Sequence, residues 1–268
     1  MSEQIRIETA ECGGFTMDFF RFGEKGAFPV VIIPGLSLLS VMDAAPIVAR
    51  AYGVLVDDGD FQVFVMDRRK ELPKQYTVEA MAEDTAKALR TIGIDRADLF
   101  GVSQGGMIAQ VLACRHQDLV ERMILGCSSP RVDADDCGVL GRWLKLAKAG
   151  KTKELMDAFA EAVYSESYVN RYRKTFDAME GMVTEKDLSR FICLAEGMKG
   201  FDISGELEKV KCPTLAITAE GDRVFGTEPS REIAEKTGGQ VYVYEGYSHA
   251  VFDETSDVQE RMHRFFSE

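Results

Sequence analysis

A serine between two glycines is the most informative chemical feature of this chain. Residues 101–105 read Gly-Val-Ser-Gln-Gly, with a short apolar run at 97–100 before them and apolar residues at helical spacing after them. A Gly-x-Ser-x-Gly turn between a strand and a helix is typical of a nucleophile elbow, which exposes the serine hydroxyl above a sheet. We therefore expect Ser103 to be a nucleophile. The alternative is an ordinary turn of small residues.

A serine hydroxyl needs a neighbouring base, and histidine is the natural one. The chain has three histidines. His116 falls at the end of the predicted helix after Ser103, far from the strand end that carries the serine. His263 falls within the predicted last helix, where a surface or packing role fits it. His249, in a loop after the predicted strand 241–244, is the one placed to reach Ser103, so we expect it to be the general base.

The base needs a carboxylate that fixes its tautomer and stabilises the imidazolium. Asp222 follows the predicted strand 214–218 and precedes His249 by enough chain for one helix and one strand. It is the expected acid, and it gives the chain order Ser, Asp, His. Glu220 and Asp253 remain as alternatives.

An oxyanion is stabilised by two backbone N–H donors close to the nucleophile. The first expected donor is the Gln104 N–H, because it lies at the positive end of the predicted helix after Ser103. The second is the Leu36 N–H, in the Pro-Gly-Leu turn that follows the predicted strand 30–34. Gly35 permits a tight turn there, and we expect it to lie against the substrate. A plain strand-to-loop turn is the alternative.

Strands alternate with helices through most of the chain, which predicts an α/β fold with a mostly parallel sheet flanked by helices. An antiparallel pair is expected at 5–10 and 15–22, a helix at 42–56, and a clear helical spacing runs from 78 to 92. Continuous apolar runs typical of strands buried on both faces occur at 30–34 and 61–66, and further strands are expected at 97–100 and 122–127. Alternating patterns typical of strands follow at 214–218 and 241–244. Ser103, Asp222 and His249 all follow strand ends, so they should meet at the edge where such sheets bind ligands.

The pattern changes after residue 128, where helical spacings replace strands until about 205. We expect an all-helical cap at 129–205, inserted into a core made of 1–128 and 206–268. Most apolar cap residues should pack against one another, and a minority should line an apolar or aromatic substrate pocket. Trp143 in the cap and Phe225, close after Asp222, are the candidates. The charged run 67–70 is interpreted as a solvated loop rather than an anion site.

The charge and composition of the chain limit the classes of partner and cofactor that we expect. The net charge of −12 argues against nucleic acid or an anionic membrane as a partner. No apolar run is long enough to span a bilayer, and residues 1–6 lack the apolar core of a signal peptide. The six cysteines form no Cys-x-x-Cys pair, so free thiols in the cytoplasm are expected. No metal or nucleotide motif occurs, and we predict no metal and no cofactor.

Taken together, these motifs are similar to those of capped serine hydrolases with the α/β-hydrolase fold, a group of esterases, lipases and carbon–carbon-bond hydrolases. Many relatives have His-Gly where this chain has Pro34-Gly35, so a side-chain contribution from that position is not expected. Relatives with an aspartate nucleophile do not match Ser103. The matching segments, which extend over nearly the whole chain, are Ile33-Pro34-Gly35-Leu36, Met66-Asp67-Arg68, Gly101-Val102-Ser103-Gln104-Gly105-Gly106, Ala219-Glu220-Gly221-Asp222 and Ser248-His249.

The resemblance implies hydrolysis of a small carboxylic ester, apolar or aromatic in character, through an acyl-enzyme on Ser103. The same three residues could instead cleave a carbon–carbon bond, transfer an acyl group to another acceptor or support a perhydrolase reaction. A capped fold of this kind could also act as a small-molecule receptor with little turnover. The sequence does not predict the oligomeric state.

Overall fold

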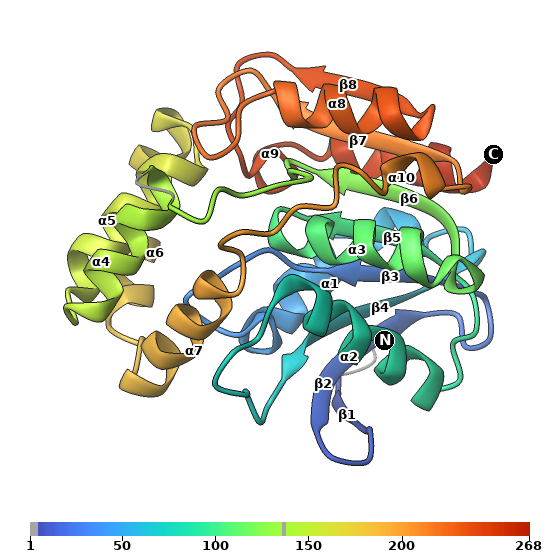
Figure 1. The fold of residues 1–268 in the computed structure, drawn as a ribbon, viewed down its shortest axis with the longest axis horizontal. Coiled ribbons are helices and arrows are strands. Elements are labelled where there is room, and N and C mark those ends of the chain that lie inside the picture. Colours follow the sequence, from blue (N-terminus) through green and yellow to red (C-terminus); the bar gives the residue numbers. More distant parts are fainter. Residues whose placement is uncertain (1–4, 136–137) are drawn as a thin grey trace.

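The computed structural model describes residues 5–135 and 138–268, and in this part of the chain one eight-stranded sheet forms the centre (Figure 1). Its strand order is β1-β2-β4-β3-β5-β6-β7-β8. β1 and β2 run antiparallel to their neighbours, and all other pairs are parallel. This confirms the predicted α/β fold with a mostly parallel sheet. The strands are β1 (Ile7–Glu11), β2 (Thr16–Gly23), β3 (Phe28–Ile33), β4 (Phe61–Arg69), β5 (Ala97–Val102), β6 (Val120–Gly126), β7 (Thr214–Ala219) and β8 (Gln240–Tyr244).

Helices cover both faces of the sheet. The helices α2 (Val78–Thr91), α3 (Gln104–Arg115) and α8 (Glu228–Thr237) pack on one face, and α1 (Ala45–Ala51) and α10 (Asp257–Ser267) pack on the other. Within β3, Val31 and Ile33 join the first apolar cluster, whereas Val30 and Ile32 join the second. Because both faces of a parallel strand are covered, both must be apolar, which explains the continuous apolar runs of the sequence.

The segment 42–56, expected as one helix, is broken into three pieces. A 3-10 turn (Val41–Ala44) precedes α1, and a second one (Gly53–Leu55) follows it. Pro46 lies in the first turn of α1, the one part of a helix where a missing N–H is tolerated, so α1 starts there. The prediction of helical conformation was right, and the prediction of a single helix was wrong.

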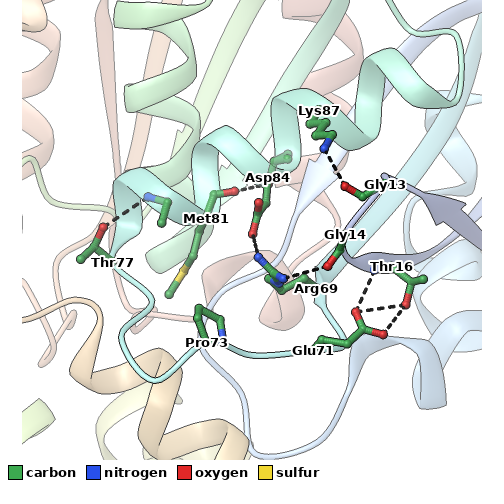
Figure 2. Close-up of polar contacts among 12 residues, drawn as sticks. Gly13, Gly14, Thr16, Arg69, Glu71, Pro73, Thr77, Met81, Asp84 and Lys87 are labelled. Atoms are coloured by element: carbon green, nitrogen blue, oxygen red, sulfur yellow. Dashed lines mark hydrogen bonds and ion pairs between the residues drawn. The ribbon is translucent and has the colours of Figure 1, made fainter.

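Strand β4 runs on to Arg69, past the end that the apolar pattern predicts. Its pairing with β2 shifts register between Met17 and Phe19, so β4 carries a bulge at this place, and bulges redirect side chains. Arg68 is only 3% exposed, so interpreting this run as a solvated loop was wrong. Arg69 instead reaches Asp84 of α2 and the carbonyl of Gly14 (Figure 2).

Among the described residues, four α-helices lie between β6 and β7, and we call them the cap helices. They occupy the left side of Figure 1, beyond the ends of the central strands. A single bridge between Arg131 and Asp202 joins the two ends of this segment. The domain limits at 129 and 205 remain a prediction. The cap helices are α4 (Val139–Lys148), α5 (Thr152–Val163), α6 (Glu166–Glu180) and α7 (Glu185–Glu196).

The cysteines and the membrane prediction can be compared with the described residues. Five cysteines are free thiols, and Cys137 lies outside the residues that the structure describes. In the ranges 5–135 and 138–268, no helix combines the length and the apolar character needed to cross a membrane.

Candidate active site

Ser103 lies in a strained turn between β5 and α3. Its φ of 51° and ψ of −116° belong to a region that residues with a side chain rarely adopt. The backbone holds the turn, because Ser103 N donates to Gly126 O at 2.8 Å and Met107 N donates to Ser103 O at 3.1 Å. Such strain persists only where surrounding contacts fix it, and it is common at active sites.

The glycines around Ser103 are required by close packing. A Cβ on Gly105 would lie 1.9 Å from Ile33 O, and one on Gly101 would lie 2.5 Å from Gly105 O. These distances are far below van der Waals contact, so only glycine lets α3 approach β3 and β5 this closely. The Gly-x-Ser-x-Gly pattern is therefore a packing requirement that fixes where Ser103 stands.

Asp222 and His249 form a buried hydrogen-bonded pair. His249 Nδ1 lies 2.9 Å from both carboxylate oxygens of Asp222. Asp222 Oδ1 also accepts hydrogen bonds from Val224 N at 2.8 Å and Phe225 N at 3.1 Å. The carboxylate is thus held in place by its own loop. A proton on Nδ1 would be donated to it, leaving Nε2 of the imidazole free as an acceptor.

The loops that carry these two residues are tied to each other. Ser248 Oγ donates to Gly221 O at 2.9 Å, and Gly221 N donates to Tyr247 O at 3.0 Å. A Cβ on Gly221 would lie 2.6 Å from Tyr247 O, so the two loops also touch directly. The position of the imidazole relative to Asp222 is therefore set by backbone contacts between the loops after β7 and β8.

Ser103 and this pair both lie near the end of β6. The Gly126 carbonyl accepts from Ser103 N, and the next residue, Cys127, has its Sγ within 4.8 Å of the ligand atoms of Asp222 and His249. Ser103 is 8% exposed and His249 4% exposed. Within the part of the chain that the structure describes, no hydrogen bond joins the Ser103 hydroxyl to the His249 ring.

The thiol of Cys127 lies close to the pair, and it is a poor nucleophile. Burial, together with the neighbouring Asp222 charge, raises the pKa of its thiol well above the ordinary value, so the thiol stays protonated at neutral pH. Cys127, Asp222 and His249 could together offer ligand atoms to a metal ion. The ion would have to displace the thiol proton and the hydrogen bond between His249 and Asp222.

Two backbone donors, free among the described residues, belong to segments that adjoin Ser103. Gln104 begins α3, so its N–H is not used by the hydrogen bonds of the helix itself. None of the described residues accepts a hydrogen bond from the Leu36 N–H. Gly35 lies against the serine, because a Cβ there would be 3.3 Å from the Ser103 Cβ. The arrangement can stabilise negative charge on an oxygen bound beside Ser103.

Arg68 is the site residue that the sequence analysis missed. Its Nη2 donates to Pro34 O at 2.7 Å and to Gln104 Oε1 at 3.2 Å. Both acceptors belong to the segments that carry the candidate oxyanion donors. The bulge in β4 breaks the two-residue period of the strand, so the sequence pattern gave no signal that this one of the charged residues at 67–70 turns inward.

The predicted pocket residues lie in different surroundings. The Phe225 ring stands edge-on to the His249 imidazole, with ring centres 5.7 Å apart. Trp143 is 4% exposed and packs on Phe159, with ring centres 4.7 Å apart, inside the cap helices. The substrate-binding role of Trp143 remains a prediction.

The other two histidines are tied to surface carboxylates. His116 Nε2 lies 3.0 Å from Glu83, and His263 Nε2 lies 2.7 Å from Asp58. Neither contacts Asp222 or Ser103 by any hydrogen bond among the described residues. His249 is therefore the histidine that the fold brings to the edge where Ser103 lies.

Comparison with known proteins agrees with this architecture. Residues 29–256 match the family described as alpha/beta hydrolase fold. The chain belongs to this family. A relative from Stutzerimonas stutzeri (strain A1501), named "Putative carbamate hydrolase RutD", is 25% identical over 194 residues, which is 71% of each chain.

Solved structures share the fold over nearly the full length. The enol-lactonase from Burkholderia xenovorans LB400 superposes with a TM-score of 0.83 at 22% identity, covering 97% of this chain and 100% of that one. MGS-M2, an alpha/beta hydrolase from a Medee basin deep-sea metagenome library, has a TM-score of 0.84 at 18% identity, with 98% of each chain covered. The protein is an alpha/beta hydrolase, and these likenesses leave the bond that it cleaves open.

Proposed function

We propose that the protein hydrolyses a small carboxylic ester through an acyl-enzyme on Ser103. The observation that carries this proposal is the buried pair of Asp222 and His249, joined at 2.9 Å, at the sheet edge where the elbow presents Ser103. A serine, a histidine and a carboxylate from three separate loops form a recurring set for acyl transfer.

In the proposed reaction, His249 Nε2 takes the proton from Ser103 Oγ as the oxygen attacks the ester carbonyl. The negative charge on the tetrahedral intermediate is stabilised by the Leu36 and Gln104 N–H groups. The intermediate collapses when His249 returns the proton to the leaving alcohol. Water, activated by the same imidazole, then hydrolyses the acyl-enzyme, while Asp222 stays ionised and orients the ring.

This mechanism requires a hydrogen bond between Ser103 and His249, which is not formed in the described part of the chain. Catalytic hydrogen bonds in unliganded enzymes are often long and tighten when the substrate binds. The backbone bonds at Ser103 N and O fix the turn, whereas the hydroxyl can rotate about the Cα–Cβ bond. The mechanism therefore requires the Ser103 hydroxyl to come within hydrogen-bond reach of His249 Nε2 when the substrate binds.

The surroundings favour an apolar or aromatic substituent on the ester. Phe225 stands beside the His249 ring. Phe225 is half-buried and also packs against the apolar cluster that contains Leu36. Such surfaces bind apolar groups and exclude water from an acyl-enzyme.

Carbamate hydrolysis is a second candidate, because several relatives carry the name quoted above. A carbamate has the same carbonyl to attack and forms the same kind of oxyanion. Its carbamoyl-enzyme is less electrophilic, so the second step would be slow and an initial burst of product would precede the steady rate.

The test compares the purified protein with Ser103→Ala, using p-nitrophenyl esters of increasing acyl length and a matched p-nitrophenyl carbamate. We expect the substitution to reduce ester turnover by at least about 10⁴-fold while the thermal unfolding midpoint changes little. Labelling by a fluorophosphonate should be lost in the same variant. Undiminished ester hydrolysis by Ser103→Ala would refute the proposal, and a wild-type protein that neither turns over nor reacts with the label would indicate a receptor.

A further inference from the structure

Arg68 connects the two segments that carry the candidate oxyanion donors. One of its acceptors, Pro34 O, lies two residues before the Leu36 N–H in the loop after β3. The other, Gln104 Oε1, belongs to the residue whose own N–H is the second donor. A single guanidinium nitrogen therefore bridges the loop after β3 and the start of α3, which must stand at a set separation to bind one oxygen.

The burial of Arg68 is costly and calls for a role. Arg68 is 3% exposed, and its Nε has no hydrogen-bond partner among the described residues. Burial lowers the pKa of its guanidinium to about 10, so the group is still charged at neutral pH. A buried charge destabilises a fold unless it is well paired. Here the guanidinium donates its hydrogen bonds to two neutral oxygens, Pro34 O and Gln104 Oε1.

The same part of β4 also connects the site to the cap. Gln104 Nε2 donates to Leu194 O of α7 at 2.8 Å. Asp67, next to Arg68, pairs with Arg190 of α7 and accepts from Ser40 Oγ at 2.6 Å. The bulge residues 67 and 68 thus link one cap helix to both loops of the oxyanion site.

We propose that Arg68 is a positioning residue that sets the separation between the Leu36 and Gln104 donors, and that α7 braces it through the Gln104 side chain. This inference rests on the proposed acyl transfer at Ser103. A fixed pair of donors stabilises the transition state without reorganisation, so a loosened pair should lower kcat more than it changes KM.

The chain offers a matched control in the next residue. Arg69 also lies on β4, but it bonds to Asp84 of α2 and to Gly14 (Figure 2) and covers the Phe15 ring at 4.6 Å. Methionine keeps the length of the arginine side chain and removes its donors. Arg68→Met and Arg69→Met therefore remove the same group from neighbouring positions with different partners.

We expect Arg68→Met to lower kcat for p-nitrophenyl acetate by about 10- to 100-fold, part of the loss that follows removal of a whole oxyanion donor, with KM within about twofold of the wild type. The affinity for a trifluoromethyl ketone, whose adduct with serine carries an oxyanion, should fall by the same factor. Arg69→Met should leave both values near the wild type. A purely structural role of Arg68 would lower the unfolding midpoint without this parallel loss.

Three outcomes separate the inference from the function on which it rests. If Ser103→Ala is inactive and Arg68→Met equals Arg69→Met in kcat and in inhibitor affinity, the role of Arg68 is refuted alone. If Ser103→Ala keeps its activity, both proposals are overturned. If Arg68→Met does not fold, Gln104→Met decides, because it removes the Oε1 acceptor and the bond to α7 while keeping the backbone donor: a lower kcat at constant KM supports the inference, and an unchanged kcat overturns it.

Discussion

The carboxylate of Asp222 accepts hydrogen bonds from three directions, and only one of them comes from His249. In Asp222→Asn, Oδ1 can still accept from Val224 N and Phe225 N, so the loop should keep its shape. The new amide nitrogen would then face His249 Nδ1 and would favour the tautomer with its proton on Nε2, which cannot accept the serine proton. We expect kcat for ester hydrolysis to fall by about 10³- to 10⁴-fold.

The measurement for this variant is steady-state ester hydrolysis at neutral pH, with thermal unfolding as the control for the fold. An unfolding midpoint close to the wild type together with the loss of kcat would assign the effect to the imidazole. A variant with normal kcat would contradict the role of Asp222 and would return Glu220 and Asp253 to consideration.

Single residues differ in how far the sequence could predict them. Ser103, Asp222 and His249 could be placed at one edge because each follows a strand, and strand ends of a parallel sheet lie together. Arg68 could not be placed, because a bulge sets its direction and a run of four charged residues ordinarily faces solvent. That the Ser103 hydroxyl and the His249 ring are not joined by a hydrogen bond in the described part of the chain could not be foreseen either, because the sequence pattern places strand ends and not side-chain atoms.

The packing of α3 against β3 is what the elbow glycines make possible. A Cβ on Gly105 would lie 1.9 Å from Ile33 O and 2.5 Å from Pro34 O, so Gly105→Ala must push the helix away from the loop that carries Leu36. We expect the free energy of unfolding to drop by about 3 kcal/mol and ester hydrolysis to be largely lost. Chemical denaturation with activity measured on the folded fraction tests both.

Gly205→Ala is the control for this substitution. No atom lies within 4 Å of a Cβ at Gly205, so the same change should alter stability by no more than about 0.5 kcal/mol. If Gly105→Ala were as stable and active as Gly205→Ala, the close approach of α3 would not be what positions the serine.

At the level of strands and helices, the apolar spacing predicted the core elements well. It predicted poorly where a helix is broken or a strand ends. The sequence pattern is uniform in some elements, and these begin and end within a few residues of the expected limits. They are α2 and the strands β3, β5 and β7. The prediction of a single helix at 42–56 was wrong because Pro46 and Gly53 interrupt the helix despite the apolar spacing around them. The prediction of where β4 ends was wrong because charged residues can continue a strand when another strand pairs with them.

The cap helices are attached to the rest of the protein on two sides of the site. On the oxyanion side, α7 reaches Asp67 through Arg190 and Gln104 through the Leu194 carbonyl. On the imidazole side, the junction of α5 and α6 binds the segment after His249: Ala250 N donates to Val163 O at 2.8 Å. Both attachments end on residues next to the catalytic set proposed here, so movement of the cap and the geometry of the site are physically linked.

A buried carboxyl at the start of the central strand β5 should make the stability of the whole protein depend on pH. Asp98, at the start of β5, is fully buried. Arg122 Nη1 lies 3.5 Å from its Oδ1, and neither carboxylate oxygen has a hydrogen-bond partner in the described part of the chain. Burial raises the pKa of this carboxyl to about 7, against the lowering effect of Arg122.

The sign of this pH dependence follows from the direction of the shift. Because the folded protein holds the Asp98 proton more tightly than the unfolded chain does, the contribution to stability is full below the ordinary aspartate pKa and is lost as the pH rises through about 7. Asp98→Asn keeps the shape and cannot ionise, so its unfolding midpoint relative to the wild type should rise between pH 5 and pH 8. Thermal unfolding of both proteins across this range tests the prediction, and a midpoint difference that stays constant with pH would show that Asp98 is ionised in the fold throughout.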